Sequence, residues 1–381
     1  MRCNLMAMAL MAALLAGCGG GGDGGNPYGH NGREPDINPG LPPAISIAPE
    51  DLGDGWSVST PAAEGLRDQD LQSTLELIRG KNWTGVDSML VVRHGKLVAE
   101  GYFNGFGRDT LHDLRSTGKS FTSALAGIAI EQGLFLVDDR ISMHIPQFDR
   151  HDNMNGGKQA IQIFHLLNMS SGLECNDWEP SSRGNEEKMY DKRDWVGFIL
   201  DLPMAYEPGQ ATQYCTGGVV VLGYIISQRS GMALDDYADA YLFGPLGIHD
   251  SGWRRSPDGQ ATGGGGLRLK PRDAAKLGQL YLSGGTWNGV RVVPADWVAA
   301  SQQRLRTLGR DQYGYLWWKR SFSWAGGFAE SFFTSGNGGN YIFVFPTLDL
   351  VVVFTGSNYN SSLGDQPFAI LSARVLPSVE M

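Results

Sequence analysis

The pattern of apolar and polar positions divides the chain into a short apolar start, a polar stretch and a long region of regular periodicity. Residues 1–18 are largely apolar, and residues 19–55 are rich in Gly and Pro. From about residue 56, apolar residues recur at helical or strand-like spacing. Such periodicity predicts helices and strands that bury one face. We therefore expect one globular domain over residues 56–376.

Apolar runs predict strands at both ends of this domain. Met89–Arg93 and Leu97–Tyr102 flank a short turn, which is typical of a β-hairpin. Tyr341–Phe345 and Leu350–Thr355 form a second such pair. Strands at both ends, with helices between them, indicate one composite sheet. The sequence thus predicts an α+β fold with an inserted, mainly helical subdomain over about residues 130–250.

Helical spacing dominates the segments between these strands. A helix from about Ser116 to Gln132 is apolar nearly all round, so we expect it to be buried. Two helices are expected to begin at Pro271 and Pro294, because proline lacks an N–H that would be unpaired at this position anyway. Further helices are expected over Ile161–Met169, Asp194–Leu202, Gly218–Gln228, Leu234–Leu242 and Gln366–Val375.

The first 18 residues have the composition of an export signal. An apolar run follows Arg2 and is too short to span a membrane. The ending Leu15-Ala16-Gly17-Cys18 resembles a bacterial lipoprotein signal, in which the cysteine is lipidated and becomes the mature N-terminus. An ordinary secretory signal is the alternative. Residues 19–55 would be a disordered Gly/Pro-rich tether. We expect an exported lipoprotein of the bacterial cell envelope, facing the periplasm and anchored through Cys18.

Composition and charge exclude some partners. The net charge is −9, with no basic footprint, so no nucleic-acid partner is expected. The seven histidines show no metal-ligand spacing, so we expect no metal and no cofactor. Nothing in the sequence determines the oligomeric state.

Two cysteines remain once Cys3 leaves with the signal and Cys18 carries lipid. These are Cys175 and Cys215, and they lie in a compartment that permits disulfides. We predict that they pair. Two separate buried thiols are the alternative.

The candidate chemistry begins with Ser116-Thr117-Gly118-Lys119 at the start of the apolar helix. Residues three apart share a helix face, so the Lys119 amine can reach the Ser116 hydroxyl. A free serine needs a neighbouring base, and the first N–H groups of a helix favour an oxyanion beside it. Chance occurrence is the alternative for this tetrapeptide alone. The chain has no Gly-x-Ser-x-Gly elbow, which excludes the α/β-hydrolase interpretation.

Three later segments accompany this tetrapeptide in a specific order. They are Tyr214-Cys215-Thr216, Gly263–Gly266 and Gly336–Asn340. With this order, and with the segment His165–Leu173, residues 60–376 resemble the serine β-lactamase and D,D-peptidase superfamily. The chain is most similar to the branch of class C β-lactamases, family VIII esterases and 6-aminohexanoate-dimer hydrolases. The resemblance implies a β-lactamase-like fold with an antiparallel sheet flanked by helices.

The resemblance also implies roles for the matching residues. Ser116 would be the acylated nucleophile, Lys119 its base partner and Tyr214 the proton shuttle to the leaving group. The backbone N–H groups of Ser116 and Asn340 would form the oxyanion hole. A Cys175–Cys215 bridge would bring Trp178 beside Tyr214 as a candidate lid. The predicted substrate-binding residues are Thr216, Asn337, Gly338, Gly339 and Trp178.

Two departures from the family pattern shape the substrate prediction. The third motif usually begins with Lys or His, which can pair with a substrate carboxylate, but Asn337 stands there. Thr216 replaces the more frequent Asn or Ser. We therefore predict a serine hydrolase of modest-sized esters or amides. A β-lactamase or D,D-carboxypeptidase-type peptidoglycan enzyme is an alternative, and a catalytically inactive envelope-binding protein is an alternative of another class.

Overall fold

A nine-stranded sheet forms the centre of the computed structural model, which describes residues 47–380. The strand order is β1-β3-β2-β14-β13-β12-β11-β10-β9. The pair β1–β3 is parallel and the other neighbouring pairs are antiparallel. The strands are β1 Ser57–Val58, β2 Val86–Arg93, β3 Lys96–Tyr102, β9 Arg306–Leu308, β10 Asp311–Tyr313, β11 Trp318–Trp324, β12 Gly327–Gly336, β13 Asn340–Phe345 and β14 Leu350–Gly356.

The composite sheet is confirmed by the pairing of β2 with β14, which joins the N-terminal and C-terminal hairpins. Every residue of β2, β13 and β14 is buried. These central strands are covered on both faces, which explains why their sequences are nearly continuous apolar runs. The strands β11 and β12 were not predicted, since their Ser, Lys and Gly residues interrupt the apolar pattern.

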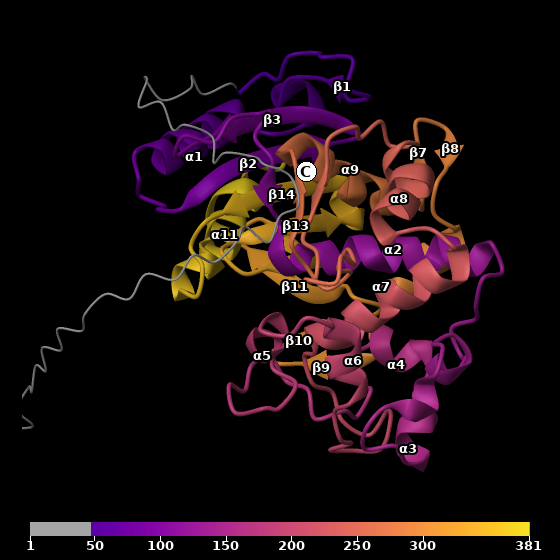
Figure 1. The fold of residues 1–381 in the computed structure, drawn as a ribbon. Helices are drawn as coiled ribbons and strands as arrows, with labels where there is room; N and C mark the ends of the chain where they lie inside the picture. Colours follow the sequence, from indigo (N-terminus) through magenta and orange to yellow (C-terminus); the bar gives the residue numbers. More distant parts are fainter. Residues whose placement is uncertain (1–46, 381) are drawn as a thin grey trace, which may run out of the picture.

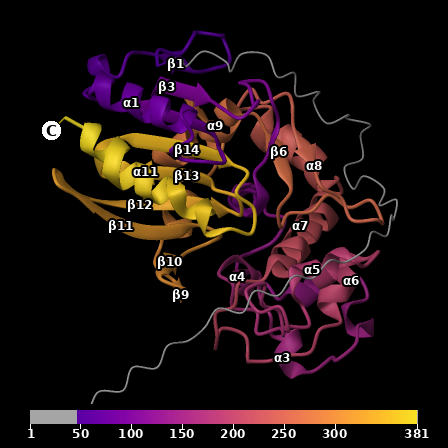
Figure 2. The same ribbon diagram turned by 90° about the vertical axis from the view of Figure 1, so that its left-hand side faces the viewer.

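Helices cover both faces of the sheet (Figures 1 and 2). α1 (Asp68–Arg79), α11 (Gln366–Ile370) and the helical turn after α11 (Leu371–Val375) lie on one face. α9 (Pro271–Leu282) packs on the other face, against β13, β14 and β2. α2 (Gly118–Glu131) lies between the sheet and the helical part, and its residues from Gly118 to Ala129 are all buried, as predicted.

The inserted subdomain occupies the lower part of Figure 1 and is mainly helical. This arrangement confirms the predicted α+β, β-lactamase-like fold. The remaining helices along the chain are α3 Gly156–Gln159, α4 Ile163–Leu167, α5 Glu186–Tyr190, α6 Trp195–Leu200, α7 Thr216–Ser230, α8 Leu234–Ala238 and α10 Ala295–Ser301. Two small sheets complete the described residues, with strands β4 His112–Asp113, β5 Gly252–Trp253, β6 Leu267–Leu269, β7 Thr286–Trp287 and β8 Val290–Arg291.

Residues 47–55 correct the predicted end of the tether. Glu50 forms an ion pair with Arg108 at 3.0 Å, and Asp54 pairs with Arg272 at 3.1 Å. This part of the predicted tether therefore lies against the domain. The predicted signal peptide, Cys18 and the tether up to residue 46 lie outside the described residues. None of the described helices combines the length and apolarity needed to cross a membrane.

Candidate active site

Ser116 lies in a single 3-10 turn, Arg115–Thr117, that runs directly into α2. Because the chain stays helical across this junction, Ser116 and Lys119 share one face, as their spacing predicts. Lys119 Nζ donates to Ser116 Oγ at 2.8 Å and to the Gly264 carbonyl oxygen at 2.5 Å. The Lys119 side chain is only 1 % exposed. The two acceptors therefore hold the amine within hydrogen-bond distance of the candidate nucleophile.

The absence of a side chain at Gly264 allows this arrangement. A Cβ atom there would lie 2.7 Å from Thr216 Cγ2 and 3.0 Å from the Thr216 carbonyl oxygen. Such distances are too short for non-bonded carbon contacts, so a larger residue would push the 263–266 segment away from α7. The glycine-rich segment thus brings a backbone carbonyl to Lys119, a role that the motif alone did not indicate.

Tyr214 immediately precedes the N-cap of α7 and reaches the same pair of residues. Lys119 Nζ lies 5.0 Å from the centre of the Tyr214 ring. The Tyr214 ring stacks on Trp178 at 5.4 Å and on Trp318 at 5.8 Å, measured between ring centres. Burial raises the pKa of the Tyr214 hydroxyl, although the charge of Lys119 and the hydroxyl of Ser116 act in the opposite direction. The phenol is therefore a proton donor at neutral pH.

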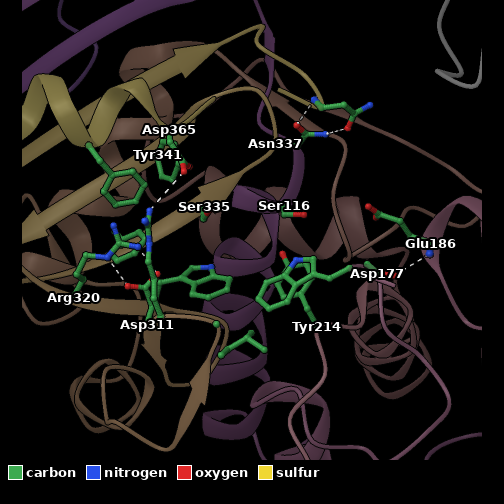
Figure 3. Close-up of a pocket in the computed structure, with 18 residues that line it drawn as sticks. Ser116, Asp177, Glu186, Tyr214, Asp311, Arg320, Ser335, Asn337, Tyr341 and Asp365 are labelled. Atoms are coloured by element: carbon green, nitrogen blue, oxygen red, sulfur yellow. Dashed lines mark hydrogen bonds and ion pairs between the residues drawn. The ribbon is translucent and has the colours of Figure 1, made fainter. Parts of the chain in front are cut away.

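Ser116 and Tyr214 open into a cavity of about 500 Å³ (Figure 3). Trp178 and Trp318 form part of its wall, and Ser335, near the end of β12, and Asn337, just after β12, line it close to Ser116. Trp317 is fully buried, whereas its neighbour Trp318, the first residue of β11, lines the cavity. The cavity is large enough for a small organic substrate.

Charged residues occupy both ends of the cavity (Figure 3). At one end Arg320 makes two hydrogen bonds to Asp311, each 2.5 Å long. Arg310 pairs with Asp365 at 3.6 Å in the same region. These residues could not be predicted from the sequence, because they come from separate strands and loops with no shared motif. Asp177 and Glu186 lie at the opposite end and were also missed.

The predicted disulfide between Cys175 and Cys215 is present in the structure, with Cα atoms 5.4 Å apart. It joins the loop that carries Trp178 to the residue that follows Tyr214. Trp178 lines the cavity and is 55 % exposed, as expected of a residue at its opening.

Asn337 lines the cavity as predicted, although its side chain already has partners. Its Nδ2 donates to Asn360 Oδ1 at 2.7 Å, and its Oδ1 accepts from the Asn360 N–H at 2.9 Å. This reciprocal pair fixes the loop that follows β12. The side-chain amide of Asn337 therefore forms part of the rim of the cavity and is not freely available to a substrate.

Four other predicted site residues do not line this cavity, so their roles stay predictions: Thr216, Gly338, Gly339 and Asn340. Asn340 is fully buried, and its Nδ2 donates to the carbonyl oxygen of Asn337 at 2.8 Å. Its own carbonyl accepts from Thr117 Oγ1 at 2.9 Å. Asn340 thus braces the turn between β12 and β13 from behind. The two glycines have φ values of 97° and 101°, which that turn requires.

The described residues contain no group of three or more His, Cys, Asp or Glu side chains that could hold a metal ion.

Comparisons with known proteins identify the family of this chain. The beta-lactamase family model matches residues 74–373. A 6-aminohexanoate-dimer hydrolase from Paenarthrobacter ureafaciens is 26 % identical over 252 residues, which covers 63 % of this chain and 63 % of the relative, less than two thirds of its length.

Solved structures show the same fold at low identity. A family VIII carboxylesterase has a TM-score of 0.64 at 18 % identity, covering 84 % of this chain and 99 % of that one. A penicillin binding protein from Bacillus halodurans has a TM-score of 0.62 at 18 % identity, covering 80 % and 98 %. The family match spans most of the described residues, and the fold and the order of the motifs agree with it. The chain belongs to the beta-lactamase family.

Proposed function

We propose that this protein is a serine hydrolase that cleaves modest-sized esters or amides through an acyl-enzyme on Ser116. One observation carries the proposal: a buried lysine amine lies 2.8 Å from the Ser116 hydroxyl, at the bottom of a cavity that Tyr214 also lines. A serine hydroxyl becomes a useful nucleophile when such a base is in place.

Acylation follows from the positions of three side chains. Ser116 Oγ attacks the substrate carbonyl carbon as its proton passes to Lys119 Nζ. Tyr214 then gives its hydroxyl proton to the leaving oxygen or nitrogen, and regains a proton from the Lys119 ammonium. The leaving group departs as an alcohol or amine, and the acyl group stays on Ser116.

The oxyanion hole in this proposal consists of the N–H groups of Ser116 and Asn337, in place of Asn340. Asn337 lines the cavity with Ser116, whereas Asn340 does not. Gly336 supports this assignment, because a Cβ there would lie 2.3 Å from the Leu114 carbonyl oxygen. The end of β12 therefore packs directly on the turn that carries Ser116. A donor of this kind contributes about 3–4 kcal/mol in other enzymes.

Deacylation uses the same groups in reverse. A water molecule replaces the leaving group and attacks the ester carbon of the acyl-enzyme. Its proton passes to the neutral Lys119 amine, either directly or through Tyr214, which takes up the proton from water as it gives its own to Lys119. The acid product departs and Ser116 Oγ recovers its proton. No cofactor is needed for either half of this reaction.

The charges around the cavity favour esters and amides over substrates that are held by a carboxylate. Within the described residues, Arg310 and Arg320 are the arginines that line the cavity, and each is paired with an aspartate. Arg320, which two hydrogen bonds join to Asp311, is therefore not an open anchor for the carboxylate of a β-lactam or a peptide. The relative from Paenarthrobacter ureafaciens is named as a 6-aminohexanoate-dimer hydrolase, and the bond that joins two 6-aminohexanoates is an amide, which supports amides as one substrate class.

The test is labelling of the purified protein with a fluorophosphonate, read by intact mass. We expect one adduct on the wild type and none on Ser116→Ala. Ser120→Ala is the matched control, because Ser120 lies one turn further along α2 and donates to the Leu316 carbonyl oxygen instead. It should be labelled like the wild type. A folded wild type that is not labelled would favour the inactive envelope-binding protein.

A substrate panel separates the remaining alternatives. We expect short acyl esters and amides to be hydrolysed faster than a cephalosporin or a D-Ala-D-Ala peptide. The reverse order would support a β-lactamase or D,D-carboxypeptidase-type enzyme.

We also propose export and lipidation at Cys18, which the motif Leu15-Ala16-Gly17-Cys18 supports. Expression in a bacterium that is fed an alkyne fatty acid should label the wild type but not Cys18→Ala. Mass spectrometry of an unmodified mature N-terminus would contradict the proposal.

A further inference from the structure

The loop 175–178 is attached to the segment 214–216 at four successive points, and we call this pair of segments the clip. The Cys175–Cys215 disulfide is the first attachment. The Asp177 N–H donates to the Tyr214 carbonyl oxygen at 2.8 Å. The Thr216 N–H donates to Asp177 Oδ2 at 2.6 Å. The Trp178 ring stacks on the Tyr214 ring with an angle of 7° between their planes.

Asp177 is the centre of the clip, because its backbone N–H donates to the segment 214–216 and its carboxylate accepts from the same segment. Its second carboxylate oxygen, Oδ1, accepts from the Glu186 N–H at 2.9 Å. One carboxylate therefore joins the first residue of α5 to the first residue of α7. The Asp177 side chain also lines the cavity, but its two oxygens are both directed to backbone N–H groups.

Few other contacts hold the backbone at Tyr214. The preceding residue, Gln213, donates to the Met169 carbonyl oxygen at 2.9 Å, and Cys215 N–H lies 3.4 Å from the Met169 sulfur. Residues 211–215 belong to no helix or strand. The position of the Tyr214 hydroxyl over Ser116 thus depends on the clip more than on regular secondary structure.

We propose that Asp177 is a positioning residue for Tyr214, and that the Cys175–Cys215 disulfide keeps it in place. The inference rests on the proposed function, in which Tyr214 protonates the leaving group. A proton donor must lie within hydrogen-bond distance of the leaving atom, and a displacement of about 1 Å can cost on the order of 100-fold in rate. Loosening the clip moves Tyr214 while Ser116 and Lys119 keep their contact, because that pair is built within one helix.

The consequence is a defect that depends on the leaving group. An alkoxide leaves poorly and needs a proton from Tyr214, whereas a p-nitrophenolate leaves without one. A loosened clip should therefore slow the acylation by an alkyl ester much more than the acylation by a nitrophenyl ester of the same acid. A general loss of folded protein would slow both reactions equally.

The experiment compares kcat/KM for ethyl butyrate and p-nitrophenyl butyrate, because kcat/KM reports acylation. For Asp177→Ala we expect a loss of about 10- to 100-fold on the ethyl ester and a much smaller loss on the nitrophenyl ester. Asp177→Asn keeps one acceptor oxygen and should recover part of the ethyl ester rate. Circular dichroism and thermal unfolding verify that each variant is folded.

The matched control is Asp194→Ala. Asp194 also accepts from a helix N-terminus in the same subdomain, through a 2.7 Å bond from the Gly197 N–H, but it does not contact Tyr214 or line the cavity. Its removal should leave the ratio of the two rates unchanged. The same shift in ratio for Asp194→Ala would overturn the inference, since the effect would then belong to the subdomain as a whole.

Reduction tests the disulfide. Dithiothreitol transfers two electrons and two protons, which yields the Cys175 and Cys215 thiols and the cyclic oxidised reagent. The reduced wild type should show the same shift in ratio as Asp177→Ala, and reoxidation should reverse it. Alkylation with mass spectrometry verifies that both thiols formed.

Three results decide the matter. A shifted ratio in Asp177→Ala and in the reduced protein supports the inference. The inference is overturned if the fluorophosphonate labels the wild type but the ratio of the two rates is unchanged in Asp177→Ala and in the reduced protein. The proposed function then stays intact. A wild type that is not labelled overturns both.

Discussion

Ser116 and Lys119 reach the cavity from a single helical turn, whereas Tyr214 reaches it through contacts with a loop about 40 residues earlier in the chain. The contact within the first pair follows from the formation and burial of α2, and the Gly264 carbonyl oxygen gives the Lys119 amine a second acceptor. Tyr214 needs a disulfide, a shared carboxylate and stacked aromatic rings to be in place. One side of the site is therefore encoded locally and the other side by tertiary structure.

This difference separates two kinds of failure. Damage to the local side should remove the nucleophile, whatever the substrate. Damage to the tertiary side should leave a nucleophile that still reacts with substrates whose leaving groups need no proton. Variants on the two sides can therefore be told apart by the substrate that they fail to use.

The largest effect is expected on the local side. Lys119→Met should lower kcat/KM by about 10²–10⁴-fold for the alkyl and nitrophenyl esters alike, because it removes the base. Lys158→Met is the matched control, since Lys158 is another buried lysine, 1 % exposed, whose amine donates to two carbonyl oxygens away from the cavity. Both variants should lose stability, but the control should keep its rate per folded molecule. Equal rate losses would remove Lys119 from the chemistry.

An intermediate effect is expected at the contact between the two sides. Gly264→Ala places a methyl group against Thr216 and displaces the carbonyl that holds Lys119. We expect the free energy of unfolding to fall by about 1–3 kcal/mol, as measured by urea titration, together with slower fluorophosphonate labelling. Gly156→Ala has no atom within 4 Å of the new Cβ and should change neither quantity. Unaltered labelling of Gly264→Ala would show that the carbonyl does not matter.

The smallest effect is expected from pH on the tertiary side. Burial, with the nearby charge of Glu186, raises the pKa of Asp177 to about 6, although the charge of Lys119 opposes the shift. Above this pH the carboxylate accepts both backbone N–H groups, and below it one oxygen carries a proton. The kcat/KM for an alkyl ester should therefore fall a few-fold as the pH falls through about 6.

The variant Asp177→Asn tests whether Asp177 causes this fall in kcat/KM at low pH. The amide of the variant cannot titrate. The ratio of kcat/KM for the alkyl ester between variant and wild type should therefore approach one at low pH and depart from one above about pH 6. If this ratio of kcat/KM stays constant with pH, another titrating group causes the fall at low pH.

The sequence predicted the features that depend on short-range spacing. The approach of Lys119 to Ser116 follows from helical geometry, and the hairpins β2–β3 and β13–β14 follow from apolar runs with turns between them. The disulfide was predicted because Cys175 and Cys215 are the two cysteines that would remain in an exported protein. The structure confirms this pairing.

The features that were missed depend on contacts between distant segments. Asp177 looked like one polar residue in a polar loop, and only the folded chain shows that it bonds to Thr216. The resemblance to the family placed the Asn340 N–H in the oxyanion hole. The turn folds back, however, so that Asn337 faces the cavity and Asn340 lies behind it. Spacing alone does not say on which side of a turn a residue lies.

The position of β14 in the sheet also governs how the protein can be made. This strand, residues 350–356, lies between β2 and β13, so the N-terminal hairpin has no partner on that edge until nearly the whole chain is available. Non-local strand pairing of this kind forms late in folding. A nascent chain must therefore keep β2 and β3 from pairing wrongly for most of its synthesis, and a chain that stops before residue 350 leaves the exposed strand edge that promotes aggregation.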